Sequence, residues 1–171
     1  MNCFDVICIG VALLDLPLGP LDDQIFQGET TMVPSIRLTT GGDAFNEAVV
    51  LSRLGKKTAL LGQIGLDLPG DFIVRRCEEE GIDHSGLRRD PQTDTRINVV
   101  MIKQDGQRHF IKTKGRGSVS LRPEEIDEEL IGKARAVSLA SMFCSKLKDG
   151  DTIWKALKTA REKGLITFAD M

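Results

Sequence analysis

Three polar residues of this 171-residue chain fall where strands of a predicted sheet end. Asp15 follows the first apolar run, Asn46 lies in the first turn of a predicted helix, and Asp170 ends the last apolar run. In open α/β sheets, ligands bind beside the carboxyl ends of the strands. Carboxylates accept hydrogen bonds from hydroxyls, and an Asn amide both donates and accepts them. Together the three side chains are suited to hydrogen-bonding a polyol.

The glycine pair Gly41-Gly42 is the more informative signal. Two glycines before a helix let the backbone approach a ligand closely, and the helix N-terminus favours polar or anionic groups. A tight turn into the helix explains the same pair equally well. The chain has neither a G-x-x-x-x-G-K-S/T phosphate loop nor a G-x-G-x-x-G dinucleotide fingerprint, which counts against a Rossmann-type nucleotide binder.

The elements that must position these residues alternate between buried strands and helices. Continuous apolar runs predict strands covered on both faces, at 4–10, 57–65, 136–141 and 165–169. Apolar residues at helical spacing predict helices at 43–54, 71–80, 123–132 and 151–163. The last strand, helix and strand form a predicted βαβ unit, which implies a parallel sheet. The fold class is therefore α/β, with a largely parallel sheet flanked by helices.

Two segments interrupt this alternation. Residues 12–40 are broken by Pro and Gly into loop and edge-type strands, and the Asp-Gly pair within 93–115 predicts an antiparallel hairpin. We therefore predict an α/β core of 1–11, 41–92 and 116–171, with inserts at 12–40 and 93–115. The chain stops directly after a buried strand, which predicts a fold that is incomplete at its C-terminal end.

Composition excludes several classes of protein. With 23 Lys and Arg against 25 Asp and Glu, the net charge of -2 argues against a nucleic-acid partner. No apolar run approaches the roughly 20 residues of a membrane span. A signal peptide carries Lys or Arg before its apolar region, and none precedes the apolar stretch 6–14. We therefore predict a cytoplasmic protein. Its four cysteines form no C-x-x-C pair, so buried reduced thiols are predicted rather than a metal site; they are Cys3, Cys8, Cys77 and Cys144.

The order of short motifs along the chain resembles the N-terminal half of the PfkB (ribokinase-like) carbohydrate kinases. The matching motifs are Gly41-Gly42 with Asn46, then Leu54-Gly55, then Gly62-x-x-Gly65-x-Asp67-x-x-Gly70. The turn Asp105-Gly106-x-Arg108 is similar to the lid turn of that family. The resemblance covers nearly the whole chain, and it implies that the two inserts form a small antiparallel β lid over a sugar.

The resemblance also assigns roles to single residues. It implies that Asp15, Gly41, Gly42 and Asn46 bind a sugar, and that the lid forms the interface of a homodimer. Arg96, on the first hairpin strand, would reach the substrate, although a solvated strand residue explains it equally well. Asp170 resembles the Asp that opens an Asp-x-Asn-x-Arg segment in some sugar-acid kinases.

The family's catalytic motifs have no counterpart among the 171 residues. Gly-Ala-Gly-Asp, which carries the catalytic base, and the magnesium-linked Asn-x-x-Glu are both missing. The resemblance implies ATP and Mg²⁺ as cofactors of the full-length enzyme, neither of them bound by identifiable residues here. We therefore predict the sugar-binding part of an ATP-dependent kinase that does not phosphorylate a sugar alone. A truncated, non-catalytic sugar-binding or dimerisation module is the alternative.

The substrate stays open among fructose-type sugars, 2-keto-3-deoxy sugar acids and nucleosides. Asp43 stands where ribokinases proper carry Lys, so ribose is not favoured. The segment 41–46 favours a hexose or a sugar acid.

Overall fold

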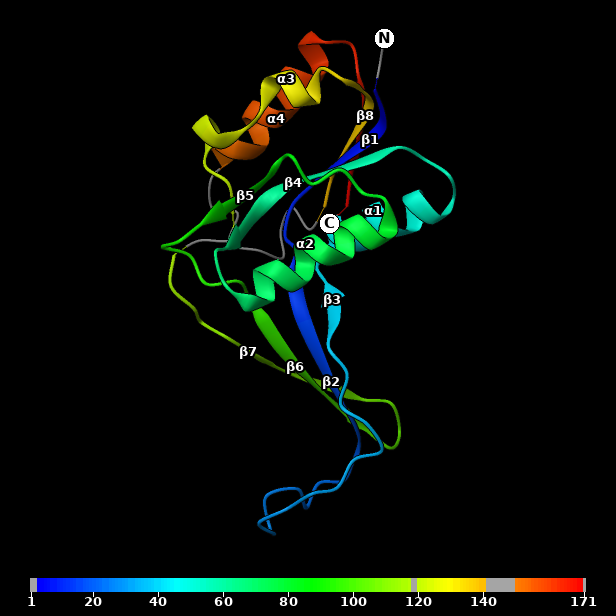
Figure 1. Ribbon diagram of the computed structural model, residues 1–171, viewed down its shortest axis with the longest axis vertical. Coiled ribbons are helices and arrows are strands. Elements are labelled where there is room, and N and C mark those ends of the chain that lie inside the picture. Colours follow the sequence, from blue (N-terminus) through cyan, green and yellow to red (C-terminus); the bar gives the residue numbers. More distant parts are fainter. Residues whose placement is uncertain (1–2, 118–119, 141–149, 171) are drawn as a thin grey trace.

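The larger of two sheets is entirely parallel. The structure, a computed structural model, describes residues 3–117, 120–140 and 150–170. The five strands of this sheet run in the order β5-β4-β1-β8-β9 (Figure 1). Their bounds are Phe4–Ile9 (β1), Thr58–Gly65 (β4), Leu87–Asp90 (β5), Ala134–Leu139 (β8) and Ile166–Ala169 (β9). The predicted α/β class and parallel sheet are therefore confirmed.

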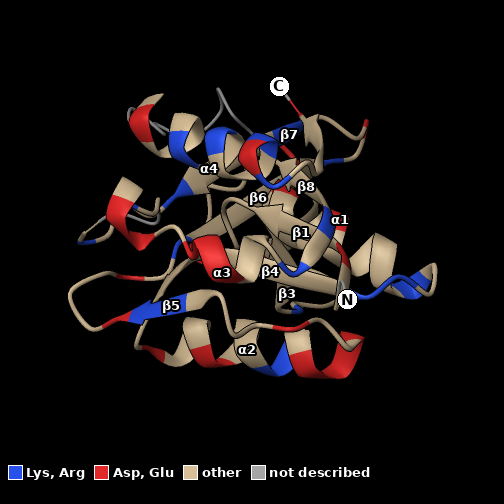
Figure 2. Cartoon of the chain, turned by 90° about the horizontal axis from the view of Figure 1, so that it is seen from above, with Lys and Arg blue, Asp and Glu red and all other residues tan. Residues whose placement is uncertain are grey.

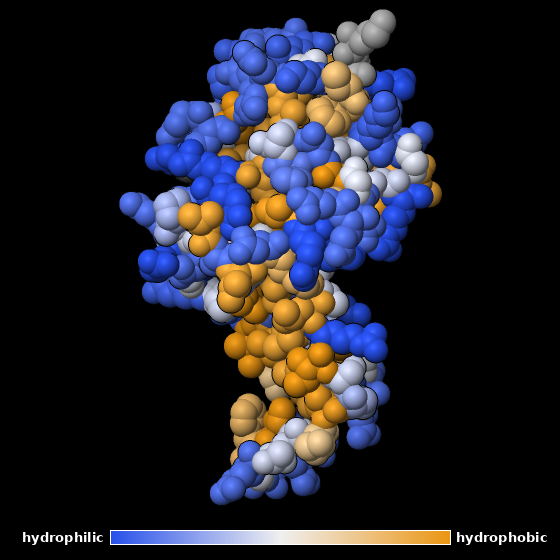
Figure 3. Space-filling view, viewed as in Figure 1, coloured by the Kyte–Doolittle hydropathy of each residue, from blue (hydrophilic) through white to orange (hydrophobic). Residues whose placement is uncertain are grey.

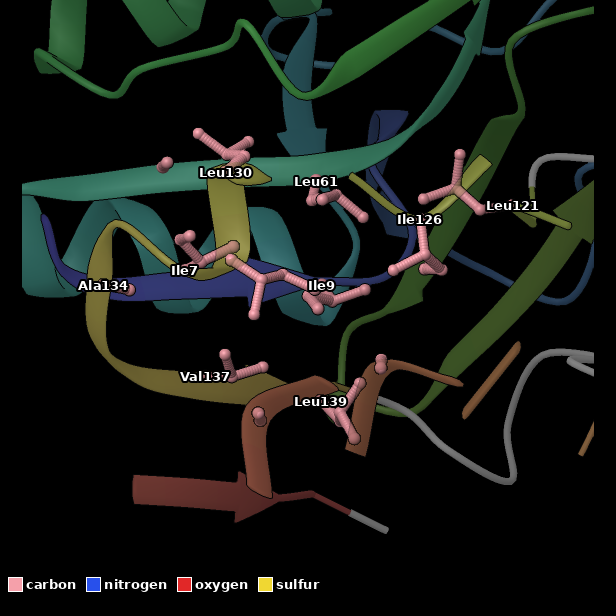
Figure 4. Packing of buried hydrophobic residues seen from close by; sticks show 13 residues of the cluster. Ile7, Ile9, Leu61, Leu121, Ile126, Leu130, Ala134, Val137 and Leu139 are labelled. Atoms are coloured by element: carbon pink, nitrogen blue, oxygen red, sulfur yellow. The ribbon is translucent and has the colours of Figure 1, made fainter. Parts of the chain in front are cut away.

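Helices cover both faces of this sheet, as its alternating side chains require. The helices are α1 (Asp43–Arg53), α2 (Leu68–Glu80), α3 (Glu128–Ile131) and α4 (Gly150–Glu162), with a 3-10 turn, η1 (Pro123–Glu125). Cys8 and Leu60 pack against α1 and α2, whereas Ile7 and Leu61 pack against α3 and α4. Figure 4 shows the second cluster, with Ile7 and Ile9 of β1 beside Val137 and Leu139 of β8. Successive residues of each strand thus fill opposite cores.

The smaller sheet projects from one end of this core (Figure 1). Its order is β3-β2-β6-β7, with bounds Leu13–Leu21 (β2), Thr39–Gly41 (β3), Ile97–Lys103 (β6) and Arg108–Lys112 (β7). The outer pairs are antiparallel, but β2 and β6 are parallel, so the sheet is mixed rather than antiparallel as expected. The reason is topological. β2 follows β1 and β6 follows β5, so both begin at the end of the parallel sheet where its strands finish.

Three local expectations need correction. The strand predicted at 165–169 is not covered on both faces, because all four residues of β9 are exposed. The helix predicted over 123–132 is broken into η1 and α3, because Asp127 accepts a hydrogen bond from the Leu130 amide (2.8 Å) and starts a new helix. Cys8 and Cys77 are buried as predicted, but Cys3 is exposed just before β1. Cys144 lies outside the described residues.

The surface carries charges of both signs. In Figure 2, α2 and α4 each carry both basic and acidic residues. No helix within the described ranges is long and apolar enough to cross a membrane.

Candidate functional site

Asp15 lies where the two sheets join, on β2 shortly after the end of β1. Its neighbours in register are Thr39 on β3 and Asn98 on β6. Oδ1 of Asp15 accepts a hydrogen bond from Nδ2 of Asn98 (2.9 Å), and its backbone carbonyl accepts one from Oγ1 of Thr39 (3.2 Å). Asp15 is therefore held by both neighbouring strands.

Gly41 provides the space that the second carboxylate oxygen occupies. A Cβ at Gly41 would overlap Oδ2 of Asp15 and would lie 2.8 Å from its Cγ. Gly42 has a φ of 92°, and a Cβ there would overlap the carbonyl oxygen of Val11. The glycine pair thus brings bare backbone against Asp15 and then against the connection from β1 to β2, immediately before α1 begins.

Asn46 lies in the first turn of α1, where its backbone amide donates to the carbonyl of Gly42 (2.9 Å). Its side chain is exposed and makes no hydrogen bond to any described residue. The structure therefore brings Asp15, Gly41 and Gly42 into contact, and it places Asn46 one helical turn beyond them with its amide available.

Arg96 and Asp170 do not join this contact through their side chains, although the backbone carbonyl of Arg96 accepts a hydrogen bond from the amide of Leu14 (2.9 Å), directly before Asp15. Nη1 of Arg96 donates to the carbonyl of Thr113 (3.2 Å), in the segment that follows β7. The exposed Asp170 follows β9, and its backbone amide donates to the carbonyl of Leu139 (2.9 Å). No hydrogen bond or ion pair joins either side chain to Asp15 within the described residues.

Glu47 is an acidic residue that none of the sequence motifs singles out. Its Oε2 is buried without a hydrogen-bond partner among the described residues. Burial raises the pKa of this carboxyl, a hydrogen bond with Ser138 opposes that shift, and the charges of Asp170 and Asp43 raise the pKa further. The negative charges of Asp43 and Asp170 therefore act on the Glu47 carboxyl near the start of α1. The sequence signal that identifies Glu47 is a charged residue between the apolar Phe45 and Ala48.

Asp67 connects the entry of β6 to the start of α2. Its Oδ1 accepts from the Gly70 amide (2.9 Å) and from Oγ1 of Thr95 (2.7 Å), and its Oδ2 accepts from the Thr95 amide (2.8 Å). A Cβ on Gly65 would lie 2.6 Å from Oδ2, and one on Gly70 would lie 3.0 Å from Oδ1. The two glycines of the Gly-x-Asp-x-x-Gly spacing thus leave room for the Asp67 carboxylate, and its hydrogen bonds connect the second sheet to the core.

The described residues offer no group of three His, Cys, Asp or Glu side chains close enough to hold a metal ion.

The parallel sheet, the projecting mixed sheet and the glycine-lined carboxylate between them define a ribokinase-like α/β protein. The fructokinase of Halothermothrix orenii matches 97% of this chain over 56% of its own, with a TM-score of 0.79 and 26% identity. A fructokinase of Xylella fastidiosa with bound ATP matches 98% of this chain over 48% of its own, with a TM-score of 0.78 and 24% identity.

The sequence agrees with this class. A model of the pfkB family carbohydrate kinases matches residues 4–170, so the chain belongs to that family and the predicted membership is confirmed. It is also 26% identical to a 5-dehydro-2-deoxygluconokinase of Clostridium beijerinckii, over 98% of this chain and 48% of that protein. The chain spans about half the length of the relatives that it matches.

Proposed function

We propose that this chain forms the sugar-binding part of an ATP-dependent carbohydrate kinase. One observation carries the proposal: the Asp15 carboxylate rests against the bare backbone of Gly41, directly before α1. A carboxylate accepts hydrogen bonds from sugar hydroxyls, and a glycine backbone lets the ring approach closely. Asn46, one turn along α1, adds an exposed amide that both donates and accepts. Fructokinases and a sugar-acid kinase among the relatives support this class of substrate.

Phosphoryl transfer from ATP depends mainly on positioning and on charge stabilisation. In our proposal the described residues supply the positioning of the sugar. The strands of 12–40 and 93–115 act as a lid, closing over the sugar to exclude water and limit the hydrolysis of ATP. The catalytic base, the ATP site and the magnesium ligands lie beyond residue 171. ATP bound to one structural relative supports the choice of phosphoryl donor.

Binding and catalysis by the 171-residue chain test this proposal separately. Titration calorimetry with D-fructose, a 2-keto-3-deoxy sugar acid and a nucleoside is expected to give binding to a hexose or a sugar acid. Replacing Asp15 with Asn is expected to remove that binding, because a neutral amide is a weaker acceptor than a carboxylate. A coupled assay for ADP with the same sugars is expected to show none formed.

Two results would contradict the proposal. If no sugar binds, or if Asp15→Asn binds as tightly as the unaltered chain, the sugar site is wrong. If the chain releases ADP in a sugar-dependent way, the base and the ATP site cannot both lie beyond residue 171.

We also propose that the lid forms a homodimer, because one of its faces is apolar. Asp15 and Asn98 lie on one face of β2 and β6, so the alternate residues face the other way. Apolar residues predominate at those alternate positions, where His109 of β7 is the polar register partner of Met101; the apolar residues are Leu14, Leu16, Leu18, Ile97, Val99, Met101 and, on β7, Ile111. Figure 3 shows apolar surface gathered over this projecting sheet. The start of α2 packs on one end of the face, and the same face of a second copy would cover the remainder.

A charge on this face is expected to prevent the dimer. Ile111 is 50% exposed, so Ile111→Glu should leave the fold intact while burying an unpaired carboxylate in any interface. We expect at least a hundredfold weaker dimer in sedimentation equilibrium. Leu54→Glu, at a 70% exposed position at the end of α1, is the matched control and should dimerise normally. A monomeric unaltered chain, or an Ile111→Glu chain that still dimerises, would exclude this interface.

A further inference from the structure

Asn98 is a buried polar residue in an otherwise apolar strand. Its neighbours along β6 are Ile97 and Val99, and its exposed fraction is only 7%. Burying an amide is unfavourable unless its hydrogen bonds are made, and an apolar side chain would pack in the same strand without that requirement. The presence of an amide there calls for a role that an apolar residue does not fill.

The contact with Asp15 fixes which way the amide faces. Asn98 is the register partner of Asp15, and its Nδ2 lies 2.9 Å from Oδ1 of that carboxylate. An ionised carboxylate only accepts hydrogen bonds, so the nitrogen of the amide must face Asp15. The other polar atom of the amide is the carbonyl oxygen of Asn98. It accepts no hydrogen bond from any residue that the structure describes.

Two hydrogen-bond acceptors on register partners therefore belong to the face of the second sheet that carries Asp15. One is Oδ2 of Asp15, against Gly41, and the other is the carbonyl oxygen of Asn98. We propose that Asn98 is a second sugar-recognition residue. Its carbonyl oxygen accepts a hydrogen bond from a hydroxyl adjacent to the one that Asp15 binds. This inference rests on the proposed sugar site and narrows its substrate to a polyol with two neighbouring free hydroxyls at this position.

The pair belongs to one rigid element. Asp15 and Asn98 stand on β2 and β6, which are hydrogen-bonded to each other along the second sheet. Any movement of that sheet relative to the core carries both acceptors together. Their spacing therefore stays matched to the same pair of hydroxyls in an open or a closed state, so Asn98 contributes to recognition rather than to closure.

Deoxy sugars distinguish recognition from a structural role. The sugar that binds the unaltered chain most tightly is titrated calorimetrically, together with its series of single-deoxy analogues. With Asn98→Ala, the affinity for the parent sugar is expected to fall about ten- to hundredfold, as for a lost hydrogen bond. The analogue that lacks the contacted hydroxyl is expected to bind both chains within about threefold, because that bond is already absent.

Two further variants keep the test decisive. Asn98→Leu has nearly the same shape and suits the apolar strand, so it should fold if the alanine variant does not, and it should show the same selective loss. Gln104→Ala removes an exposed amide just beyond β6 and is expected to change neither affinity nor selectivity.

The outcomes separate this inference from the proposed function. If Asp15→Asn loses sugar binding while Asn98→Ala and Asn98→Leu keep it, the sugar site stands and the role of Asn98 is wrong. The role is also wrong if both Asn98 variants lose affinity equally for the parent sugar and for every deoxy analogue, because Asn98 then acts only by supporting Asp15. If the unaltered chain binds no sugar, both proposals fail.

Discussion

Gly41→Ala is expected to lose sugar binding while the chain stays folded. The added Cβ would overlap Oδ2 of Asp15 and would lie 2.9 Å from Cδ1 of Leu13. Both obstacles are ends of side chains, so they move aside at an expected cost of about 1 kcal/mol in folding free energy. The movement, however, takes the Asp15 carboxylate away from the position at which it accepts hydrogen bonds. We expect a loss of affinity of roughly a hundredfold or more, since hydrogen bonds to a charged group are the strong ones.

The neighbouring Gly42→Ala supplies the contrast. Gly42 has a φ of 92°, which strains any other residue, and its Cβ would overlap the backbone carbonyl of Val11. A backbone atom does not yield as a side chain does, so we expect about 2–3 kcal/mol of destabilisation. In a chain of this size that lowers the thermal midpoint by roughly 5–10 °C. Calorimetric titration and thermal unfolding of both variants give the comparison. If Gly41→Ala binds sugar normally, Asp15 does not act at this place.

The core is easier to predict from the sequence than the second sheet, because the pattern of its strands is visible within a few neighbouring residues. Strands buried on both faces appear as continuous apolar runs, so β1 and β4 can be found from composition alone. β5 escapes such a pattern because only Leu87 among its four residues is buried. β2 has the composition of a loop or edge strand because Pro17, Gly19 and Pro20 interrupt it, yet it pairs with β6 through a shift in register between Leu18 and Leu21.

The candidate site likewise contains residues that local motifs identify and a residue that they miss. A local order of motifs identifies Asp15 and Gly41, and the structure places them in contact. Asn98 escapes such motifs because its partner Asp15 is 83 residues away, and only the register of β2 against β6 brings the two together. A single polar residue in an apolar strand is visible in the sequence, but nothing in the sequence shows which strand lies beside it. Local sequence patterns therefore do not show which strands, far apart in the sequence, pair with each other.

Asp67→Ala is expected to destabilise the fold strongly. It removes the acceptor for the Gly70 amide at the start of α2 and for both donors of Thr95. Thr95 is buried, so its amide would be left without a partner at a cost of about 1–3 kcal/mol, and the lost helix cap adds about 1 kcal/mol. We expect a total loss of about 2–4 kcal/mol and a thermal midpoint lowered by roughly 10 °C.

Hydrogen exchange shows where that loss falls. Thr95 stands two residues before β6, so releasing it should loosen the second sheet before the parallel sheet. Amides of β6 and β7 are therefore expected to exchange faster in Asp67→Ala, while those of β1 and β4 change less. Asp71→Ala is the matched control, because it removes an exposed carboxylate from the same helical turn, where an ion pair with Arg89 contributes at most about 1 kcal/mol. Equal effects of the two substitutions on the midpoint, or uniform exchange across both sheets, would show that Asp67 only caps α2 and does not anchor β6.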